Sequence, residues 1–514
     1  MRLEKVGGSG LGAAGAVGAG SGSIRGSMDP ARSPLRIALH RSSSRSSGAP
    51  LPPLDLLCAA TSLRDHLRAR QAALPRLSLT DAALEPDPAP QLEAAAAFAP
   101  DALVLSADPV ELERRSRDAA LWLDPLREAG HRLDSVTSGT TGQAATRIAW
   151  IEEDGQAAEA LLTSGAADLV VRGEADATLP EILERAVEQR RSGAAATWSG
   201  TRGVSWLQGG EVRHERELGS PTSIPTPAWD LIDLSRYSTT GPLEPSGRGA
   251  SRDALARAFS RHLPDWVRRM PRSAIGQGVR RGIGQVLGGP PERRATIYTV
   301  RACSPDCPTC HGSFGMHGHQ RPVKEILQEV RELVHKHRIR ELAIGDHAFD
   351  GQPGRALAIA EGIAKIRSAP GAGHVRLTFP RGLRGDGLTP ELIDALHAAG
   401  LRTAPLRVVT ASPRLQRLLK ENINLERVSR ALDYLAAHGG RGHLMLRLGL
   451  PTETVGEVAH TIRWARSSSA VSASFESGRH IDLGPAWTQT QEGEIDDFPS
   501  LRRRALTLFY SSPK

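Results

Sequence analysis

Two long stretches of the sequence alternate between short apolar runs and amphipathic segments, and this alternation limits the fold more than any other feature. In the first stretch, strand-like runs at 99–108, 146–154 and 166–176 are each followed by a helical pattern, at 109–130, 156–165 and 178–193. Strands that alternate with helices indicate a parallel sheet covered by helices, and ligands bind at the carboxyl ends of such strands. We therefore expect an α/β, doubly wound domain over residues 35–193.

A second alternation begins near residue 296. Its strand-like runs are 295–303, 340–349, 374–382, 403–411, 442–450 and 471–478, and its helical patterns are 323–337, 354–368, 389–400, 425–439 and 455–468. Six β–α units in a row predict a partial (β/α)6 barrel over residues 296–480, with the functional groups on the loops that follow the strands.

The remaining segments divide the chain further, as 514 residues would suggest. Residues 1–34 are rich in Gly, Ala and Ser, and we expect a disordered leader. Residues 194–295 read as a connector, with a hairpin that turns at Gly209 and Gly210, followed by an Arg-rich insertion. The solvated face of an amphipathic helix explains those arginines more simply than an anionic partner does. Residues 481–514 form a short tail.

Three of the chain's 4 cysteines, Cys303, Cys307 and Cys310, lie directly after the first strand of the expected barrel, in the spacing C-x3-C-x2-C. Four cysteines so clustered do not make a disulfide framework, which indicates a reducing, cytoplasmic compartment. Three thiolates can bind zinc or an iron–sulfur cluster. Structural zinc takes four ligands, and His311, His317 or His319 would complete a Cys3His site.

A C-x3-C-x2-C loop after the first strand of a βα barrel resembles the radical S-adenosylmethionine (radical SAM) superfamily. The resemblance implies that Cys303, Cys307 and Cys310 hold a [4Fe-4S] cluster with one open iron, where S-adenosylmethionine binds. It implies that a 5′-deoxyadenosyl radical is formed and that an electron donor such as a flavodoxin or ferredoxin supplies the electron.

The first half of the chain is similar to the cobalamin-dependent branch of that superfamily. Residues 166–184, AADLVVRGEADATLPEILE, and residues 224–237, IPTPAWDLIDLSRY, resemble the end of a cobalamin-binding Rossmann domain and its connector. The resemblance implies a cobalamin cofactor. The Asp-x-His-x-x-Gly motif, whose His binds cobalt, is absent, so the lower face of the corrin would be covered by side chains or water. The acidic residues at 152–154 would place negative charge near the corrin, or they form a solvated loop.

The resemblance also implies four further cofactor-binding residues. Asp346 in GDHAFD would face the cofactors, although a helix cap or loop carboxylate is an alternative. Ser412, and Glu453 in GLPTET, would contact S-adenosylmethionine, while a strand-to-helix turn also explains GLPTET, in which Thr452 stands where Gly is usual. Ser106, at the end of a strand, would lie over the corrin ring.

These features predict a radical SAM enzyme that methylates or rearranges an unactivated carbon of a small metabolite, most simply as a cobalamin-dependent methyltransferase. The alternative is a zinc-binding interaction protein with a Cys3His site and an Arg-rich partner-binding segment. No apolar run has the length of a membrane span, so we expect no membrane partner. The net charge of +8 comes without a nucleic-acid-binding motif, so we expect no nucleic-acid partner either.

Overall fold

The structure is a computed structural model of the 514-residue chain. It describes residues 34–42, 52–84, 89–107, 124, 126–132, 145–151, 155–192, 198–215, 223–239, 292–301, 319–478 and 498–511. Four features of the sequence lie outside the described residues. They are the predicted leader, the acidic residues at 152–154, almost all of the Arg-rich insertion, and the three clustered cysteines.

The N-terminal half forms a seven-stranded sheet in the order β2-β1-β3-β4-β5-β6-β7. Its strands are β1 (Arg36–Ser42), β2 (Arg76–Asp81), β3 (Ala102–Ala107), β4 (Thr146–Ile151), β5 (Leu169–Arg172), β6 (Val204–Gln208) and β7 (Glu211–His214). The first five are parallel, and the β6–β7 hairpin adds to β5 in antiparallel orientation. The strand order reverses between β1 and β3, which is the point where doubly wound sheets bind ligands.

Helices cover both faces of this sheet. On one face, α1 (Leu54–Ala69) and α6 (Ala175–Ser192) pack on alternate residues of the strands, such as Leu39 and Val104. On the other face, α2 (Ala89–Ala97) and α5 (Gly155–Thr163) pack on the intervening residues. The strands are therefore buried on both sides, as continuous apolar runs in a parallel sheet require.

The structure confirms the doubly wound α/β fold and adds to it. The expected strands and helices between residues 146 and 193 are present, as is the hairpin at Gly209 and Gly210. Of the helix expected at 109–130, the structure describes Asp124 and residues 126–132, which are helical. Residues 53–62, PLDLLCAATS, are an apolar run that begins helix α1. Neither α1 nor β2 was expected from the sequence. The sheet continues through the hairpin to His214, beyond the expected boundary at 193.

The C-terminal half is a partial barrel of six parallel strands, which confirms the expected architecture. The strands are β9 (Glu292–Ile297), β12 (Glu341–Ile344), β13 (Arg376–Thr378), β14 (Thr403–Val409), β15 (Arg441–Leu448) and β16 (Ser472–Ser477). Ladders join them in chain order, except that β13 and β14 meet through two isolated parallel bridges. The two-residue strand β8 (Ser238–Thr239) extends the β9 edge in antiparallel orientation.

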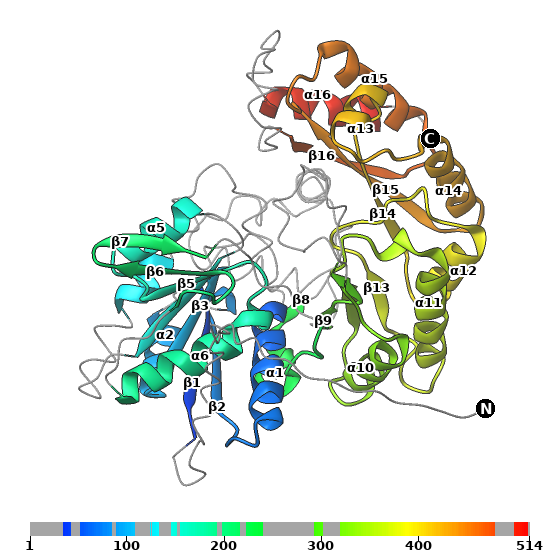
Figure 1. Ribbon diagram of the computed structural model, residues 1–514. Helices are drawn as coiled ribbons and strands as arrows, with labels where there is room; N and C mark the ends of the chain where they lie inside the picture. The colour runs from blue at the N-terminus through cyan, green and yellow to red at the C-terminus, as the bar shows by residue number, and fades with distance from the viewer. Residues whose placement is uncertain are drawn as a thin grey trace, which may run out of the picture.

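Helices follow the barrel strands and form its outer layer (Figure 1). They are α10 (Val323–His335), α11 (Pro353–Arg367), α12 (Pro390–Ala398), α13 (Pro413–Leu418), α14 (Leu425–Ala437), α15 (Val455–Ser467) and α16 (Phe498–Tyr510). Side chains of Thr389, Asn424 and Thr454 cap α12, α14 and α15, because the first N–H groups of a helix have no partner within the helix. The expected tail contributes α16, whose Phe509 is buried in the barrel core.

Helix α1 lies between the two halves (Figure 1). One side of α1 packs on the N-terminal sheet, while Leu54, Leu57 and Cys58 belong to the same apolar core as the barrel strands. The connector adds Trp229 and Tyr237 to that core. An apolar interface of this kind makes the two halves one packed unit.

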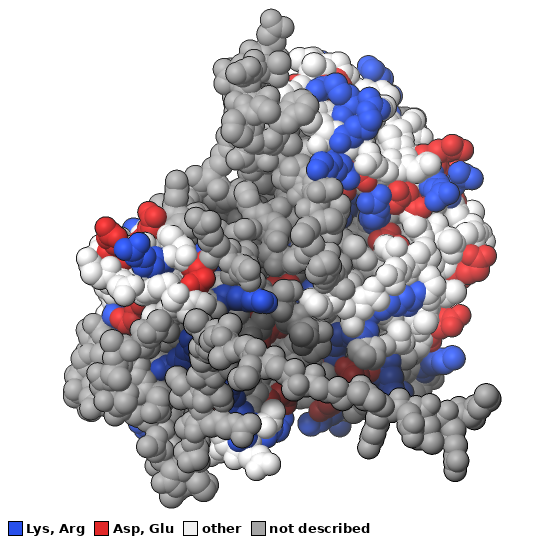
Figure 2. All heavy atoms as spheres, viewed as in Figure 1, with Lys and Arg blue, Asp and Glu red and all other residues white. Residues whose placement is uncertain are grey.

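Charged side chains cover much of the described surface in the view of Figure 2, and Lys and Arg gather over the end of the barrel that carries α13, α15 and α16. Elsewhere in this view acidic and basic groups are interspersed. None of the helices in the described residues combines the length and the apolar character that a bilayer span requires.

Candidate active site at the strand ends of the two halves

The segment that holds Cys303, Cys307 and Cys310 starts and ends at the mouth of the barrel. It follows β10 (Val300–Arg301), which continues from β9, and it precedes β11 (His319–Gln320). β10 and β11 pair in antiparallel orientation, with Arg301 opposite His319, so both ends of the segment are held side by side. The three cysteines themselves lie outside the described residues.

Asp346, at the end of β12, supports the start of that segment. Its carboxylate accepts hydrogen bonds from the Thr299 backbone N–H, at 2.7 Å, from the Thr299 hydroxyl, and from the Val300 backbone N–H, at 3.2 Å. The side chain is buried, and burial raises the pKa of Asp346 to about 6 although the hydrogen bonds oppose that rise. Asp346 thus acts as a loop carboxylate; direct contact with a cofactor stays a prediction.

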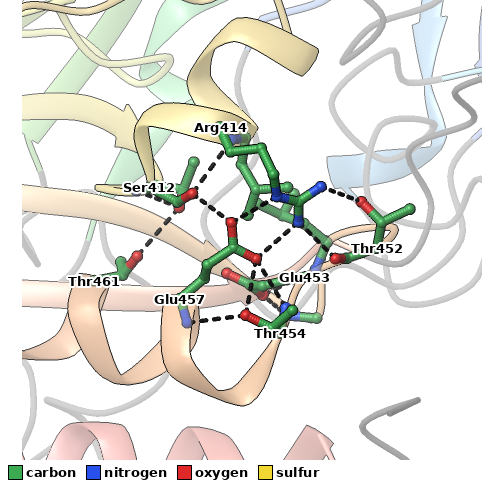
Figure 3. Close-up of polar contacts among 11 residues, drawn as sticks. Ser412, Arg414, Thr452, Glu453, Thr454, Glu457 and Thr461 are labelled. Atoms are coloured by element: carbon green, nitrogen blue, oxygen red, sulfur yellow. Dashed lines mark hydrogen bonds and ion pairs between the residues drawn. The ribbon is translucent and has the colours of Figure 1, made fainter. Parts of the chain in front are cut away.

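Ser412 lies in a hydrogen-bonded network at the ends of β14 and β15 (Figure 3). Its hydroxyl caps α13 by accepting from the Leu415 N–H and donates to Glu457 Oε1 at 2.7 Å. Arg414 donates to the same carboxylate at 2.9 and 2.8 Å. The Arg414 guanidinium is the main reason that the pKa of Glu457 is lowered to about 2.

Glu453 stands in the turn that joins β15 to α15, next to this network (Figure 3). Its Oε2 accepts from the backbone N–H groups of Gly449, at 2.6 Å, and Leu450, at 3.1 Å, whereas Oε1 is buried without a hydrogen-bond partner. Burial raises its pKa to about 7. Thr452 has a φ of +62°, and Arg414 holds it by donating to its carbonyl at 2.7 Å and to its hydroxyl at 3.0 Å.

Ser412 and Glu453, far apart in the sequence, are therefore brought to neighbouring strand ends through Arg414. Neither Arg414 nor Glu457 was predicted from the sequence. An S/T-x-x-E signature, Thr454 to Glu457, was the available signal, because it marks a capping box at a helix start, which the structure contains.

Ser106 lies at the carboxyl end of β3 and is buried. Its register partner on β1 is Arg41, so Ser106 stands at the point where the strand order reverses. Arg41 makes a buried ion pair with Asp81 at 2.5 Å, and the Tyr237 hydroxyl donates to the same carboxylate at 2.7 Å. This edge is thus rigidly held, and it is where a ligand of such a sheet is expected.

A second group at the same edge was not foreseen. Glu174 and Asp176 follow β5, and both are buried. Asp176 accepts from Arg301 of the barrel at 2.6 Å. Burial raises the pKa of Glu174 to about 8, and its Oε2 has no hydrogen-bond partner. Charged residues within apolar runs, as in VVRGEAD and YTVRAC, were the signal that could have indicated a buried pair.

The fold and the cysteine spacing define a two-part α/β protein, with a doubly wound sheet in one half and, in the other, a partial barrel whose first strand is followed by three clustered cysteines. Residues 297–465 match the family described as the Radical SAM superfamily. The barrel is therefore a radical SAM domain, which confirms the family expected from the cysteine spacing, and no comparison points to zinc.

Two curated relatives are methyltransferases by name. The chain is 21% identical over 313 residues to the uncharacterised methyltransferase PH0819 of Pyrococcus horikoshii, covering 60% of this chain and 54% of the relative. It is 24% identical over 192 residues to cytidylyl-2-hydroxyethylphosphonate methyltransferase of Streptomyces wedmorensis, covering 36% and 35%. The chain thus spans about half and about a third of the length of these relatives.

Solved structures match almost the whole chain. The radical S-adenosylmethionine methyltransferase TsrM from Kitasatospora setae, solved with cobalamin and a [4Fe-4S] cluster, matches with a TM-score of 0.58 and 16% identity over 87% of this chain and 75% of that one. The cobalamin-dependent radical enzyme OxsB, solved with aqua-cobalamin, matches with a TM-score of 0.58 and 14% identity over 93% and 56%. At these identities the likeness establishes the fold, which is that of cobalamin-dependent radical SAM enzymes.

Proposed function

We propose that this chain is a cobalamin-dependent radical SAM methyltransferase that acts on a small-molecule substrate. The observation that carries the proposal is the juxtaposition of two strand-end edges in one packed unit: a radical SAM barrel with three cysteines after its first strand, and a doubly wound sheet of the fold that TsrM and OxsB share. The methyltransferase names of both curated relatives support the reaction class.

The donor set fits a cubane cluster. Three thiolates on one loop leave one iron of a [4Fe-4S] cluster without a protein ligand, whereas a structural zinc site takes four protein ligands. We assign cluster binding to Cys303, Cys307 and Cys310. When bound, S-adenosylmethionine and the cluster supply a 5′-deoxyadenosyl radical, and cobalamin supplies a carrier for the methyl group.

The described residues around these groups have supporting roles in the proposal. Asp346 holds Thr299 and Val300, from which the cysteine segment starts, at hydrogen-bonding distance. Glu453, with one unpartnered oxygen, and Ser412 line the strand ends assigned to S-adenosylmethionine. Ser106 stands at the strand-order reversal assigned to the corrin.

The proposal extends to the surroundings of the enzyme. A reduced cluster needs an electron donor, for which a flavodoxin or ferredoxin is suited, and a cytoplasmic location keeps the thiolates reduced. The substrate is a small molecule whose reacting carbon is unactivated.

Metal and cofactor analysis of anaerobically reconstituted protein tests the proposal. We expect about four iron and four sulfide per chain, as a [4Fe-4S] cluster requires, with cobalt bound when cobalamin is added. Replacing Cys303, Cys307 and Cys310 by Ala abolishes iron and sulfide binding. The matched control is Cys58→Ala, since Cys58 lies on α1, is buried in the apolar core and donates its thiol to the Pro225 carbonyl. One zinc without sulfide would overturn the proposal in favour of the interaction protein.

Mass spectrometry of the products tests the reaction class. Reconstituted protein incubated with candidate metabolites and S-adenosylmethionine labelled in its methyl group is expected to give a product heavier by one labelled methyl. A rearranged product without label would reassign the reaction within the same family.

A further inference from the structure

Arg301 is a buried cation between the two halves of the molecule. It lies on β10, two residues before Cys303, and its side chain is 3% exposed. Nη1 donates to Asp176 Oδ2 at 2.6 Å, Nη2 lies 3.6 Å from Asp55 Oδ1, and the guanidinium stacks on the Tyr298 ring at 5.0 Å. Both carboxylates come from the N-terminal half, from the first turns of α6 and α1. One residue beside the cysteine segment is thus bound by the other half.

Stability alone does not explain this pair. Desolvating two charges costs about as much as their attraction returns, so a buried ion pair is weak evidence for stability and is often replaceable by apolar side chains. The halves also have an apolar interface, in which Leu54, Leu57 and Cys58 of α1 join the barrel core. An ion pair with hydrogen-bonding geometry adds what apolar contact lacks, namely a fixed direction and distance.

The surroundings of the pair place it at the ligand edge of the N-terminal sheet. Asp176 begins α6 directly after β5, and its neighbour Glu174 is buried at the same strand end. Buried atoms without a hydrogen-bond partner gather here: Arg301 Nε and Nη2, Asp176 Oδ1, Glu174 Oε2 and Thr178 Oγ1. Buried polar groups are nearly always paired in native proteins. So many unpaired polar atoms together indicate that water or a ligand supplies their hydrogen-bond partners.

We propose that Arg301 and Asp176 are positioning residues that fix the cysteine segment of the barrel relative to the ligand edge of the N-terminal sheet. The inference rests on the proposed function, because it takes the cysteine segment as the cluster loop and the sheet edge as the cobalamin site. A shift of the loop by about 1 Å would leave each half able to bind its own group, but would misplace the two groups for methyl transfer.

The test uses the full-length, reconstituted protein with Arg301→Met and Asp176→Leu combined, because removing both charges leaves neither of these two buried groups as an isolated charge. Asp55 remains, but its side chain is 19% exposed and keeps access to water. The matched control combines Arg294→Met and Glu341→Leu. That pair has a 2.7 Å contact between a partly buried Arg294 and a buried Glu341, but both residues lie within the barrel, at the first ladder position of β9 and β12. Single replacements at Arg301 and Asp176 provide the remaining corners of a double-mutant cycle.

We expect the Arg301/Asp176 double variant to keep its unfolding temperature, iron and sulfide content, and 5′-deoxyadenosine formation within about twofold. Methyl transfer from S-adenosylmethionine to added cobalamin, followed by absorbance, is expected to fall at least tenfold. Hydrogen exchange, read by mass spectrometry, is expected to rise at β10–β11 and at the start of α6 in this variant but not in the Arg294/Glu341 control.

Failure of the proposed function can be distinguished from failure of the positioning role. If the unaltered protein binds no cluster, the proposed function fails. If the unaltered protein binds the cluster and methylates cobalamin, and the Arg301/Asp176 double variant matches it in hydrogen exchange and in the ratio of methyl transfer to cleavage, the positioning role alone is overturned. A variant that loses only thermal stability, with exchange and ratio unchanged, also overturns it.

Discussion

The strand-end edges of the two halves hold their carboxylates in different ways. At the barrel mouth, Asp346, Asp350 and Glu453 are buried and accept hydrogen bonds from backbone N–H groups of the barrel itself. At the edge of the N-terminal sheet, Asp81 and Asp176 are buried against arginine side chains. The barrel edge is thus complete within its own half, whereas the N-terminal edge depends on Arg301 of the barrel and on Tyr237 of the connector.

This difference has an energetic consequence. A carboxylate held by backbone N–H groups can be replaced by a neutral amide with the loss of part of its hydrogen bonding. A carboxylate paired with a buried guanidinium leaves a charge in an apolar environment when it is neutralised. Neutralising a carboxylate should therefore cost more at the N-terminal edge than at the barrel edge.

The largest effect is expected for Asp81→Asn. Asp81 accepts from Arg41 Nε at 2.8 Å and Nη2 at 2.5 Å and from the Tyr237 hydroxyl, and the side chains of both ion-pair members are nearly inaccessible. Removing its charge should lower the free energy of unfolding by about 3–5 kcal/mol, the range for breaking a buried pair. Asp350→Asn, which alters hydrogen bonds from the Arg384 and Gly385 N–H groups, should cost about 1–2 kcal/mol. Urea unfolding measures both.

The double variant Arg41→Met, Asp81→Leu serves as the control for that comparison, because it removes both charges and should recover most of the lost stability. Equal costs for Asp81→Asn and Asp350→Asn would remove the distinction between the two edges.

A smaller effect is expected for Glu457→Gln, at a barrel-edge carboxylate that pairs with an arginine. The Arg414 side chain is 45% exposed, so water screens this pair. Gln keeps the capping box with Thr454, and the loss should be about 0.5–1 kcal/mol near neutral pH. Because the pKa of Glu457 is lowered to about 2, its contribution is present above pH 4.5 and is lost as the pH falls through about 2. Thermal unfolding at pH 7 and pH 2 tests this, and a cost at neutral pH as large as that of Asp81→Asn would contradict it.

The elements that could be predicted from the sequence are those with a clear local pattern of apolar residues. The barrel strands were predictable because each is a short apolar run followed by a periodic helix. Helix α1 was not recognised as a helix in its apolar run, since Leu54, Leu56, Leu57 and Cys58 are all buried, between a sheet and a barrel, and leave no polar face to show a period. Strand β2 was missed because its first residues are partly exposed.

The residues of the candidate site also differ in whether a local pattern could predict them. The cysteine spacing and the GLPTET turn are local patterns. The first predicted the family, and the second predicted a strand-to-helix turn, with Glu453 as a candidate contact to S-adenosylmethionine. The pair of Arg301 with Asp176 joins residues 125 positions apart, and that of Arg41 with Asp81 joins residues 40 apart. No local pattern encodes such a partner, because the first pair depends on how the two halves dock and the second on the register of β1 with β2.

A further effect is expected at Glu453, and it depends on pH. Burial raises the pKa of Glu453 from 4.5 to about 7, so the folded state holds its proton more tightly than the unfolded state does. The folded form with a protonated Glu453 is fully favoured below about pH 4.5, and this contribution is lost as the pH rises through about 7. Glu453→Gln, which cannot ionise, should leave stability at pH 5 almost unchanged and should weaken the decline between pH 5 and pH 8. Urea midpoints at the two pH values measure the difference. A decline as steep in the variant as in the unaltered protein would mean that the turn accommodates the ionised carboxylate, and that a backbone-held edge tolerates charge as well as an arginine-paired one does.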